Sequence, residues 1–135
     1  SGARATMRAA FAKPDAFDTL GFTCMACGGV NPQSRLLGTP EQLAQFADRL
    51  AERRRRGEVD LRFSIGSRDN QLPCNRAFWE LFRREGVVGD GDDDHFLVYE
   101  GALHDFAFME RSYGPQLLWH LTALDRIAQK KRQRG

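Results

Sequence analysis

The chain has 135 residues, of which 41% are hydrophobic and 28% charged, so it can bury the core of one domain. Its 20 lysines and arginines face 18 aspartates and glutamates, and the formal charge of +2 does not favour a nucleic-acid or membrane-surface protein. No apolar run approaches the roughly 20 residues of a membrane span, and no signal peptide is recognisable. Three cysteines do not make a disulfide framework, so we expect reduced cysteines and a cytoplasmic protein.

Apolar periodicity predicts helices that alternate with strands. In chain order we expect a helix over Ala3–Lys13, a strand over Leu20–Ala26, a loop over Asn31–Gly38, a helix from Thr39 that stops at Gly57, a strand over Val59–Ile65, a helix over Pro73–Glu85, a turn over Gly89–Asp94, a strand over Phe96–Tyr99 and a helix over Gly114–Gln129. This alternation is typical of an α/β domain, with a mainly parallel sheet and helices on both faces.

Local signals add detail to two of the helices. Thr39, followed by Pro40 and Gln42, has the pattern of a capping box and predicts where the second helix begins. The tail Lys130–Gly135 is polar and is expected to fray. In the last helix we expect the apolar residues to face the core: Leu117, Leu118, Leu121, Leu124 and Ala128.

Three clusters have both a functional and a structural interpretation, and in each case we adopt the structural one. The run Arg53–Arg56 suits nucleic acid, but cations in the last turn of a helix also favour its dipole. Cys24 and Cys27 have the spacing of a metal half-site or redox pair, yet no second ligand pair follows, so we expect core residues of a buried strand. The aspartates of Asp90–Asp94 lack the spacing of a calcium loop and predict a solvated turn.

Two loops that follow strands carry residues suited to acid–base chemistry. Asp69 follows the strand Val59–Ile65, and His104 follows the strand Phe96–Tyr99. Because ligands and catalytic groups gather at the carboxyl ends of parallel strands, we expect the two side chains to lie together. A carboxylate that orients an imidazole, which then deprotonates a nucleophile, is the relay of serine hydrolases. In α/β-hydrolases, serine, acid and histidine follow one another in this order.

These residues also have simpler interpretations. Asp69 or its neighbour Asn70 can cap the following helix, and His104 can be an ordinary loop histidine. The order of the two residues on successive loops favours the catalytic interpretation for both. Structural roles are expected for three other titratable residues: His95, Asp105 and His120.

Three segments, in order, carry a resemblance to a known family. They are Ser1–Phe17, which ends in Pro-Asp-Ala-Phe, then Phe63–Asn70, and then Val98–Phe106. They resemble the helix after the nucleophile, the acid loop and the histidine loop of the esterase D and enterochelin-esterase-like branch of the α/β-hydrolases. The resemblance covers nearly the whole chain, but only the C-terminal half of that fold. It implies a serine esterase acting on a small-molecule ester, with Asp69 and His104 as acid and histidine and with no metal or organic cofactor.

The chain departs from the family at the nucleophile, whose pattern is Gly-x-Ser-x-Gly. Without a gap, Gly2 takes the last glycine, and the catalytic serine then precedes Ser1. Ser1 would supply the backbone N–H of the oxyanion hole. A slip of one residue instead makes Ser1 the nucleophile. An N-terminal nucleophile is a third alternative, which the α/β pattern disfavours.

The resemblance has consequences for the partners of the chain. Residues 1–135 would form the C-terminal part of a single hydrolase domain, and a companion chain or segment would supply the N-terminal strands that cover its sheet edge. No nucleic acid or membrane is expected as a partner. The alternative from another function class is a hydrolase-like module without catalysis that serves in binding or assembly.

Overall fold

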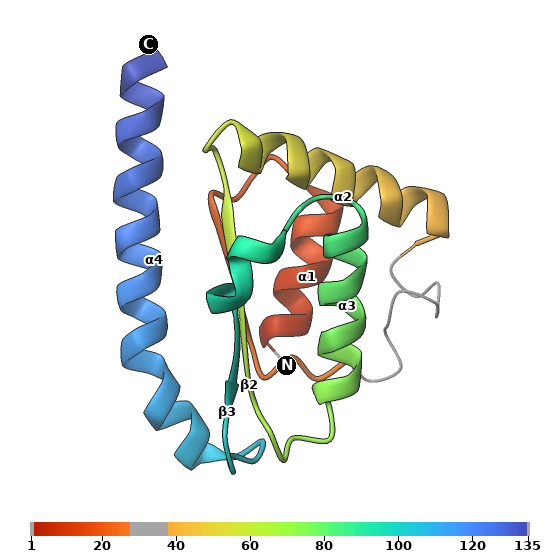
Figure 1. Cartoon of the computed structure of the whole chain (residues 1–135), viewed down its shortest axis with the longest axis vertical. Coiled ribbons are helices and arrows are strands. Elements are labelled where there is room, and N and C mark those ends of the chain that lie inside the picture. Colours follow the sequence, from red (N-terminus) through yellow and green to blue (C-terminus); the bar gives the residue numbers. More distant parts are fainter. Residues whose placement is uncertain (1, 28–37, 135) are drawn as a thin grey trace.

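The computed structural model describes residues 2–27 and 38–134, so Ser1 and nearly all of the predicted loop Asn31–Gly38 lie outside the described residues. Within these ranges the chain forms a three-stranded parallel sheet in the order β1-β2-β3, flanked by helices (Figure 1). The elements are α1 (Gly2–Ala12), β1 (Thr19–Thr23), α2 (Pro40–Arg55), β2 (Asp60–Gly66), α3 (Leu72–Arg84), the 3₁₀ helix η1 (Asp90–His95), β3 (Phe96–Tyr99) and α4 (Phe106–Arg134). The predicted α/β class is confirmed.

The two faces of the sheet differ in chemistry. α1, α2 and α3 lie on one face, and α4 lies on the other (Figure 1). On the three-helix face, Phe63 of β2 packs against Phe22, Trp79, Phe82 and Phe96, with ring centroids 4.7–6.0 Å apart. This aromatic cluster is the centre of the hydrophobic core.

The face toward α4 is polar because the strands alternate. Arg62 and Ser64 of β2 are buried there, and the Arg62 guanidinium donates to the Pro115 carbonyl at 3.3 Å. The prediction of a strand over Leu20–Ala26 that is buried on both faces is therefore wrong. β1 ends at Thr23, and its apolar side chains all point to the three-helix face of the sheet. A Cβ on Gly21 would overlap the side-chain ends of Gln116 and His120, so a larger residue here would require these two side chains of α4 to move.

The start and the end of α2 follow from identifiable residues. The predicted capping box is confirmed, since Gln42 N donates to Thr39 Oγ1 at 3.1 Å and Thr39 N donates to Gln42 Oε1 at 2.8 Å. At the other end, Arg53 is buried and donates to backbone carbonyls, and Arg54 makes a bidentate pair with Asp92 at 2.7 and 2.8 Å. Asp92 is thereby tied into the structure, whereas Asp90, Asp93 and Asp94 are exposed, so the expectation of a solvated turn fails for Asp92 alone.

The prediction for the last helix is wrong in extent and in orientation. α4 begins at Phe106, where Asp105 Oδ1 accepts the Phe108 N–H at 2.9 Å, and it runs to Arg134 through the tail that was expected to fray. The predicted inward leucines face solvent, with exposed fractions of 61, 66, 57 and 41% for Leu117, Leu118, Leu121 and Leu124.

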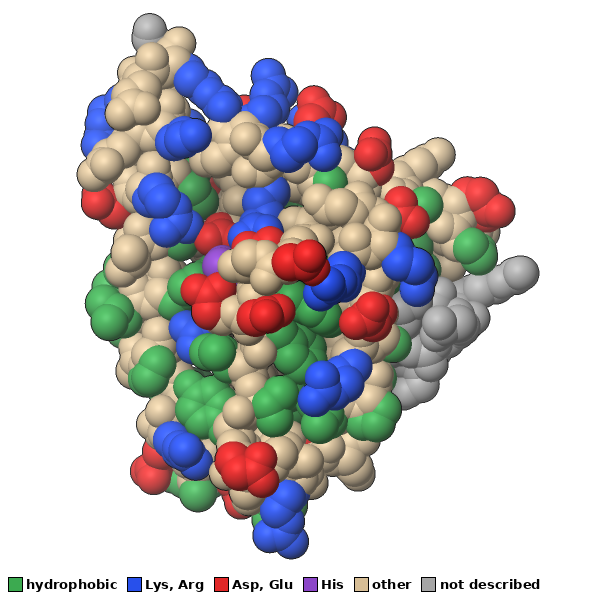
Figure 2. Space-filling view, in the orientation of Figure 1, with side chains coloured by type: hydrophobic (Ala, Val, Ile, Leu, Met, Phe, Trp, Pro, Cys, Tyr) green, Lys and Arg blue, Asp and Glu red, His purple; other side chains and the backbone are tan. Residues whose placement is uncertain are grey.

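Three ion pairs tie the C-terminal part of α4 to the rest of the fold. Arg126 donates to Asp60 at 2.7 Å, Lys131 to Asp18 at 3.0 Å and Arg134 to Glu58 at 2.8 Å. The side of α4 that packs on the sheet buries uncharged residues, namely Phe108, Ser112, Gln116, Ala123 and Ile127. The ion pairs come from half-exposed side chains beside them. Figure 2 shows hydrophobic side chains at the surface on the α4 side of the molecule.

No helix in the described ranges is long and apolar enough to cross a membrane.

The expectation for the cysteines is also corrected. Cys27 and Cys74 form a disulfide across 47 residues of sequence, with Cα atoms 6.4 Å apart. Cys24 is a free, buried cysteine, as expected of a core residue, although it lies after β1 rather than within the strand. The sequence has no spacing signal for the pair because the fold, not local sequence, brings the segment after β1 onto the start of α3.

Candidate functional site

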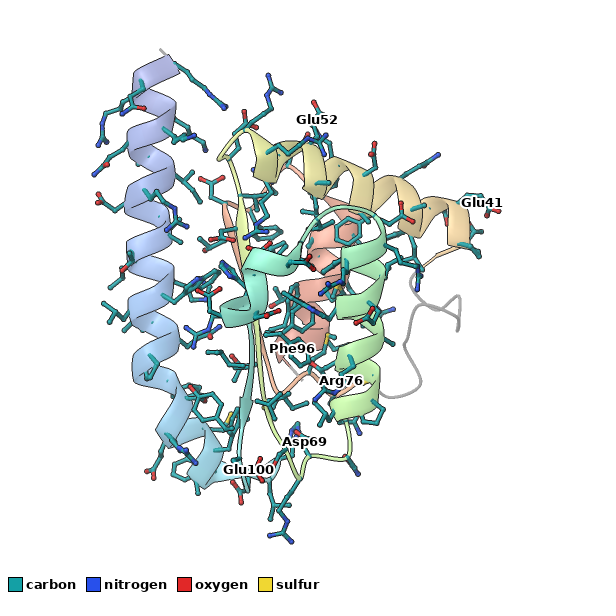
Figure 3. The ribbon with its side chains drawn as sticks, in the orientation of Figure 1. Glu41, Glu52, Asp69, Arg76, Phe96 and Glu100 are labelled. Carbon is teal, nitrogen blue, oxygen red and sulfur yellow. A yellow bond between two sulfur atoms is a disulfide. The ribbon has the colours of Figure 1, made fainter. Side chains whose placement is uncertain are left out.

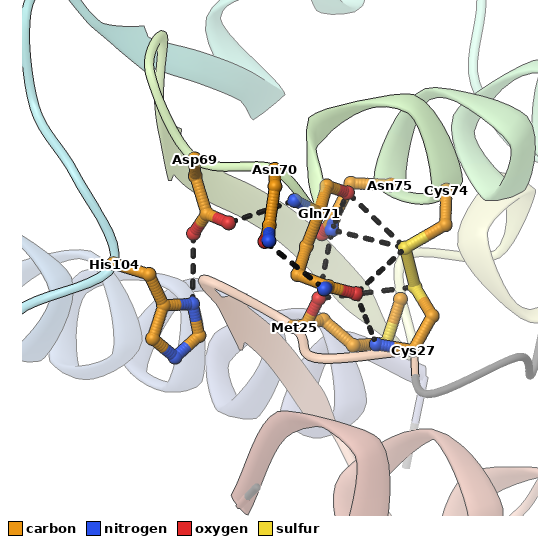
Figure 4. Close-up of a disulfide and its surroundings, with 8 residues drawn as sticks. All are labelled: Met25, Cys27, Asp69, Asn70, Gln71, Cys74, Asn75 and His104. Carbon is orange, nitrogen blue, oxygen red and sulfur yellow. Dashed lines mark hydrogen bonds and ion pairs between the residues drawn. A yellow bond between two sulfur atoms is a disulfide. The ribbon is translucent and has the colours of Figure 1, made fainter.

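Asp69 and His104 meet at the carboxyl ends of β2 and β3. Asp69 Oδ2 lies 2.8 Å from His104 Nδ1, and the Asp69 side chain is fully buried while that of His104 is 36% exposed (Figure 4). Asp69 and Glu100, labelled in Figure 3, mark the end of the sheet at which the two loops emerge. The predicted proximity of Asp69 and His104 is thus confirmed.

Backbone bonds hold the two loops together. Ser67 N donates to Tyr99 O and Arg68 N donates to Ala102 O, both at 2.9 Å. A Cβ on Gly66 would lie 2.1 Å from Ala102 O, so glycine is required for this close approach. Backbone hydrogen bonds therefore hold the loop that carries the acid beside the loop that carries the histidine, independently of the contact between the two side chains.

Asp69 makes the contacts that both of its interpretations require. Its Oδ1 accepts the Gln71 N–H at 2.8 Å, which is the turn-stabilising role, while its Oδ2 pairs with His104. The N-cap of α3 is Gln71 and makes no side-chain cap, so Asn70 does not cap this helix. A buried carboxylate with both oxygens engaged has a fixed orientation toward the imidazole.

The pairing determines what His104 can do chemically. When Nδ1 carries the proton donated to Asp69, the other ring nitrogen, Nε2, is an acceptor. His104 forms no other hydrogen bond within the described residues, and its ring borders a cavity of about 330 Å³ lined in part by Arg68, Asn70 and Leu103. A half-exposed imidazole with a free acceptor nitrogen beside a cavity is suited to take a proton from a bound hydroxyl.

Cys24 lies near this pair but is not a suitable nucleophile. Burial, with a further contribution from the negative charge of Asp69, raises the pKa of the Cys24 thiol to about 11. The thiol is then almost wholly protonated at neutral pH, and the thiolate is the nucleophilic form. Cys24 is 1% exposed and has a φ of 43°, an unusual backbone conformation for a residue other than glycine.

A second group of residues surrounds the acid and was missed from the sequence. Gln71 Oε1 accepts the Cys27 N–H at 3.0 Å, and the fully buried Asn75 donates from Nδ2 to Met25 O at 2.9 Å (Figure 4). With the Cys27–Cys74 disulfide, these bonds fasten the segment after β1 to the start of α3. Only the position of Gln71 and Asn75, just after Asp69, was a usable signal in the sequence.

The remaining titratable residues have structural roles, as expected. His120 Nδ1 lies 2.9 Å from Thr19 Oγ1, and burial lowers the His120 pKa. His95 contacts Asp60 at the opposite end of the sheet, and the hydrogen bond to this carboxylate raises the His95 pKa. Among residues 2–27 and 38–134, no group of three or more His, Cys, Asp or Glu side chains is arranged to hold a metal ion.

The chain matches no protein-family model, and neither a curated protein nor a solved structure is significantly similar to it. The function is therefore inferred from the side chains themselves. Of the three predicted site residues, Asp69 and His104 are brought together, and Ser1 lies outside the described residues.

Proposed function

We propose that this chain supplies the acid and the histidine of a serine-type ester hydrolase of the α/β-hydrolase type, a C-terminal half of that fold. The observation that carries the proposal is the 2.8 Å contact between a fully buried carboxylate, Asp69, and a half-exposed imidazole, His104. The two residues follow successive parallel strands, in the order in which an α/β-hydrolase has its acid and histidine.

In this mechanism His104 Nε2 accepts the hydroxyl proton of a serine while the serine oxygen bonds to the ester carbonyl carbon. Backbone N–H groups stabilise the resulting oxyanion, and that of Ser1 is one of them when the serine precedes it. His104 then returns the proton to the alcohol oxygen as the ester bond breaks. A water then bonds to the acyl carbon as His104 takes its proton, and His104 returns this proton to the serine oxygen as the acyl–serine bond breaks and the acid leaves. Asp69 keeps the proton on Nδ1 and stabilises the imidazolium. The serine precedes Ser1 or, if the alignment slips by one residue, is Ser1 itself.

Two surfaces support the companion segment that this proposal requires. β1 pairs only with β2 among the described strands, so its outer edge has free backbone donors and acceptors. The leucines of α4 are about half exposed, and complete burial of four such side chains contributes about 4 kcal/mol. A strand added beside β1 and a helix laid on the leucines of α4 would satisfy both surfaces.

The test is hydrolysis of an activated ester such as 4-nitrophenyl acetate by the purified protein together with the companion segment that carries the serine, with and without His104→Ala. We expect this substitution to reduce kcat at least a thousandfold while the far-UV circular dichroism spectrum is unchanged. His95→Ala is the matched control, because it removes an imidazole at the other end of the sheet. Full activity in His104→Ala would exclude His104 from the mechanism, and no activity in the unmodified protein would favour the binding or assembly module.

A further inference from the structure

We propose that Gln71 and the Cys27–Cys74 disulfide form a clamp that positions the Asp69 carboxylate against His104, so that reduction of this disulfide loosens the pair. The catalytic consequence rests on the proposed function, whereas the clamp itself concerns only the geometry of Asp69 and His104. Gln71, Cys27 and Cys74 are thus positioning residues, since none of them contacts the imidazole.

Gln71 connects the acid to the segment after β1. Its backbone N–H donates to Asp69 Oδ1 at 2.8 Å, and its side-chain Oε1 accepts the Cys27 N–H at 3.0 Å. Its backbone carbonyl accepts Asn75 Nδ2 at 2.8 Å. One residue therefore links the carboxylate, the segment containing Cys27 and the first turn of α3. Displacement of Gln71 would remove one of the two bonds that orient Asp69.

The disulfide is adjacent to Gln71. Cys74 Sγ is 3.1 Å from the Gln71 carbonyl oxygen, and Cys27 is 2% exposed (Figure 4). The covalent bond fixes the Cys27 N–H at the position where Gln71 Oε1 accepts it. Without the bond, the two segments are held together by the Asn75 side chain and the Gln71 amide, which exchange with water far more readily than a covalent link breaks.

Reduction is a defined chemical step. A dithiol transfers two electrons and two protons to the Cys27–Cys74 bond, giving two thiols, and is itself converted into a cyclic disulfide. Cys24 is free and contributes nothing to this step. After reduction we expect Gln71 to move, so that its N–H no longer holds Oδ1 of Asp69 in one position. The hydrogen bond between Asp69 and His104 should then break more often.

The test uses long-range ¹H–¹⁵N NMR spectra of the full chain at pH 8.5, where an ordinary imidazole is neutral. These spectra report which ring nitrogen carries the proton. In the oxidised protein we expect His104 to carry it on Nδ1, with slow exchange. After reduction with dithiothreitol, and in Cys27→Ser/Cys74→Ser, we expect at least tenfold faster exchange and loss of the Nδ1 preference. His95, whose Nδ1 is 2.8 Å from Asp94 Oδ1, is the internal control and should not change.

Gln71 variants test the clamp with the disulfide intact. Gln71→Ala should reproduce the effect of reduction, and Gln71→Glu, which keeps the acceptor oxygen, should restore the Nδ1 preference. Ile127→Ala removes a buried side chain on α4 and controls for general loss of stability. An unchanged His104 signal after complete reduction would overturn the clamp. Loss of the signal in a protein that never hydrolyses an ester would support the clamp and contradict the proposed function.

Discussion

Replacement of Asp69 by asparagine separates the charge of the acid from its shape. Oδ1 of the amide still accepts the Gln71 N–H, so the turn after β2 is retained. The second atom changes from an acceptor to an N–H₂ donor and faces His104 Nδ1 at 2.8 Å. Nδ1 must then accept, the ring proton moves to Nε2, and the nitrogen that should take the serine proton is blocked.

The expected loss in kcat is about 10⁴-fold, as is typical of this swap in a serine relay, and corresponds to about 5.4 kcal/mol of transition-state stabilisation. KM should change little, because the carboxylate does not contact the ester. The assay is steady-state hydrolysis of 4-nitrophenyl acetate at pH 8, with intact mass confirming that asparagine has not reverted to aspartate.

The control for this substitution is Asp94→Asn. Asp94 Oδ1 also lies 2.8 Å from an imidazole Nδ1, that of His95, but at the opposite end of the sheet. Asp94→Asn removes the same negative charge as Asp69→Asn and alters the same kind of aspartate–histidine contact. We expect kcat to change less than twofold. A kcat for Asp69→Asn within threefold of the unmodified protein would refute the reasoning, because the protonation of His104 would then not depend on Asp69.

Three further predictions concern stability. Thr39→Ala removes the side-chain cap of α2 and should lower the free energy of unfolding by about 1 kcal/mol in urea titrations, whereas Thr39→Ser should preserve it. The hydrogen bond to Asp60 raises the pKa of His95 above 6.5, so its stabilisation is complete below pH 6.5 and is lost as pH rises through the raised value; His95→Gln should flatten this part of a plot of Tm against pH. Leu117→Gln and Leu121→Gln replace exposed side chains and should each change the free energy of unfolding of the isolated chain by less than about 0.5 kcal/mol in urea titrations.

The sequence was sufficient wherever a local rule applies. The capping box at Thr39 needs only three neighbouring residues, and the strand boundaries follow from period-two alternation in Asp60–Gly66. The Asp69–His104 pair was predictable because parallel strands bring their carboxyl ends to one edge of the sheet, so that residues on the two following loops lie close together.

Contacts between distant segments decided the parts that could not be predicted. The apolar stripe of α4 does not by itself say which side is covered, and the covered side is instead the one with Ser112, Gln116, Ala123 and Ile127. Arg126, Lys131 and Arg134 make ion pairs with residues 66 or more positions away. The last helix was predicted to begin at Gly114, yet α4 begins at Phe106 and continues through Pro115. The cysteines of the disulfide are 47 residues apart, and no spacing rule reaches that far.

The most direct test of the central claim is covalent labelling with a fluorophosphonate probe, followed by intact mass measurement of every chain in the purified sample. The probe reacts with a serine only when an adjacent base activates it. We predict one label per protein, on Ser1 or on a serine in a companion chain or segment, and no label in His104→Ala. Labelling that persists in His104→Ala, or no label on any chain, would contradict the claim that Asp69 and His104 activate a serine.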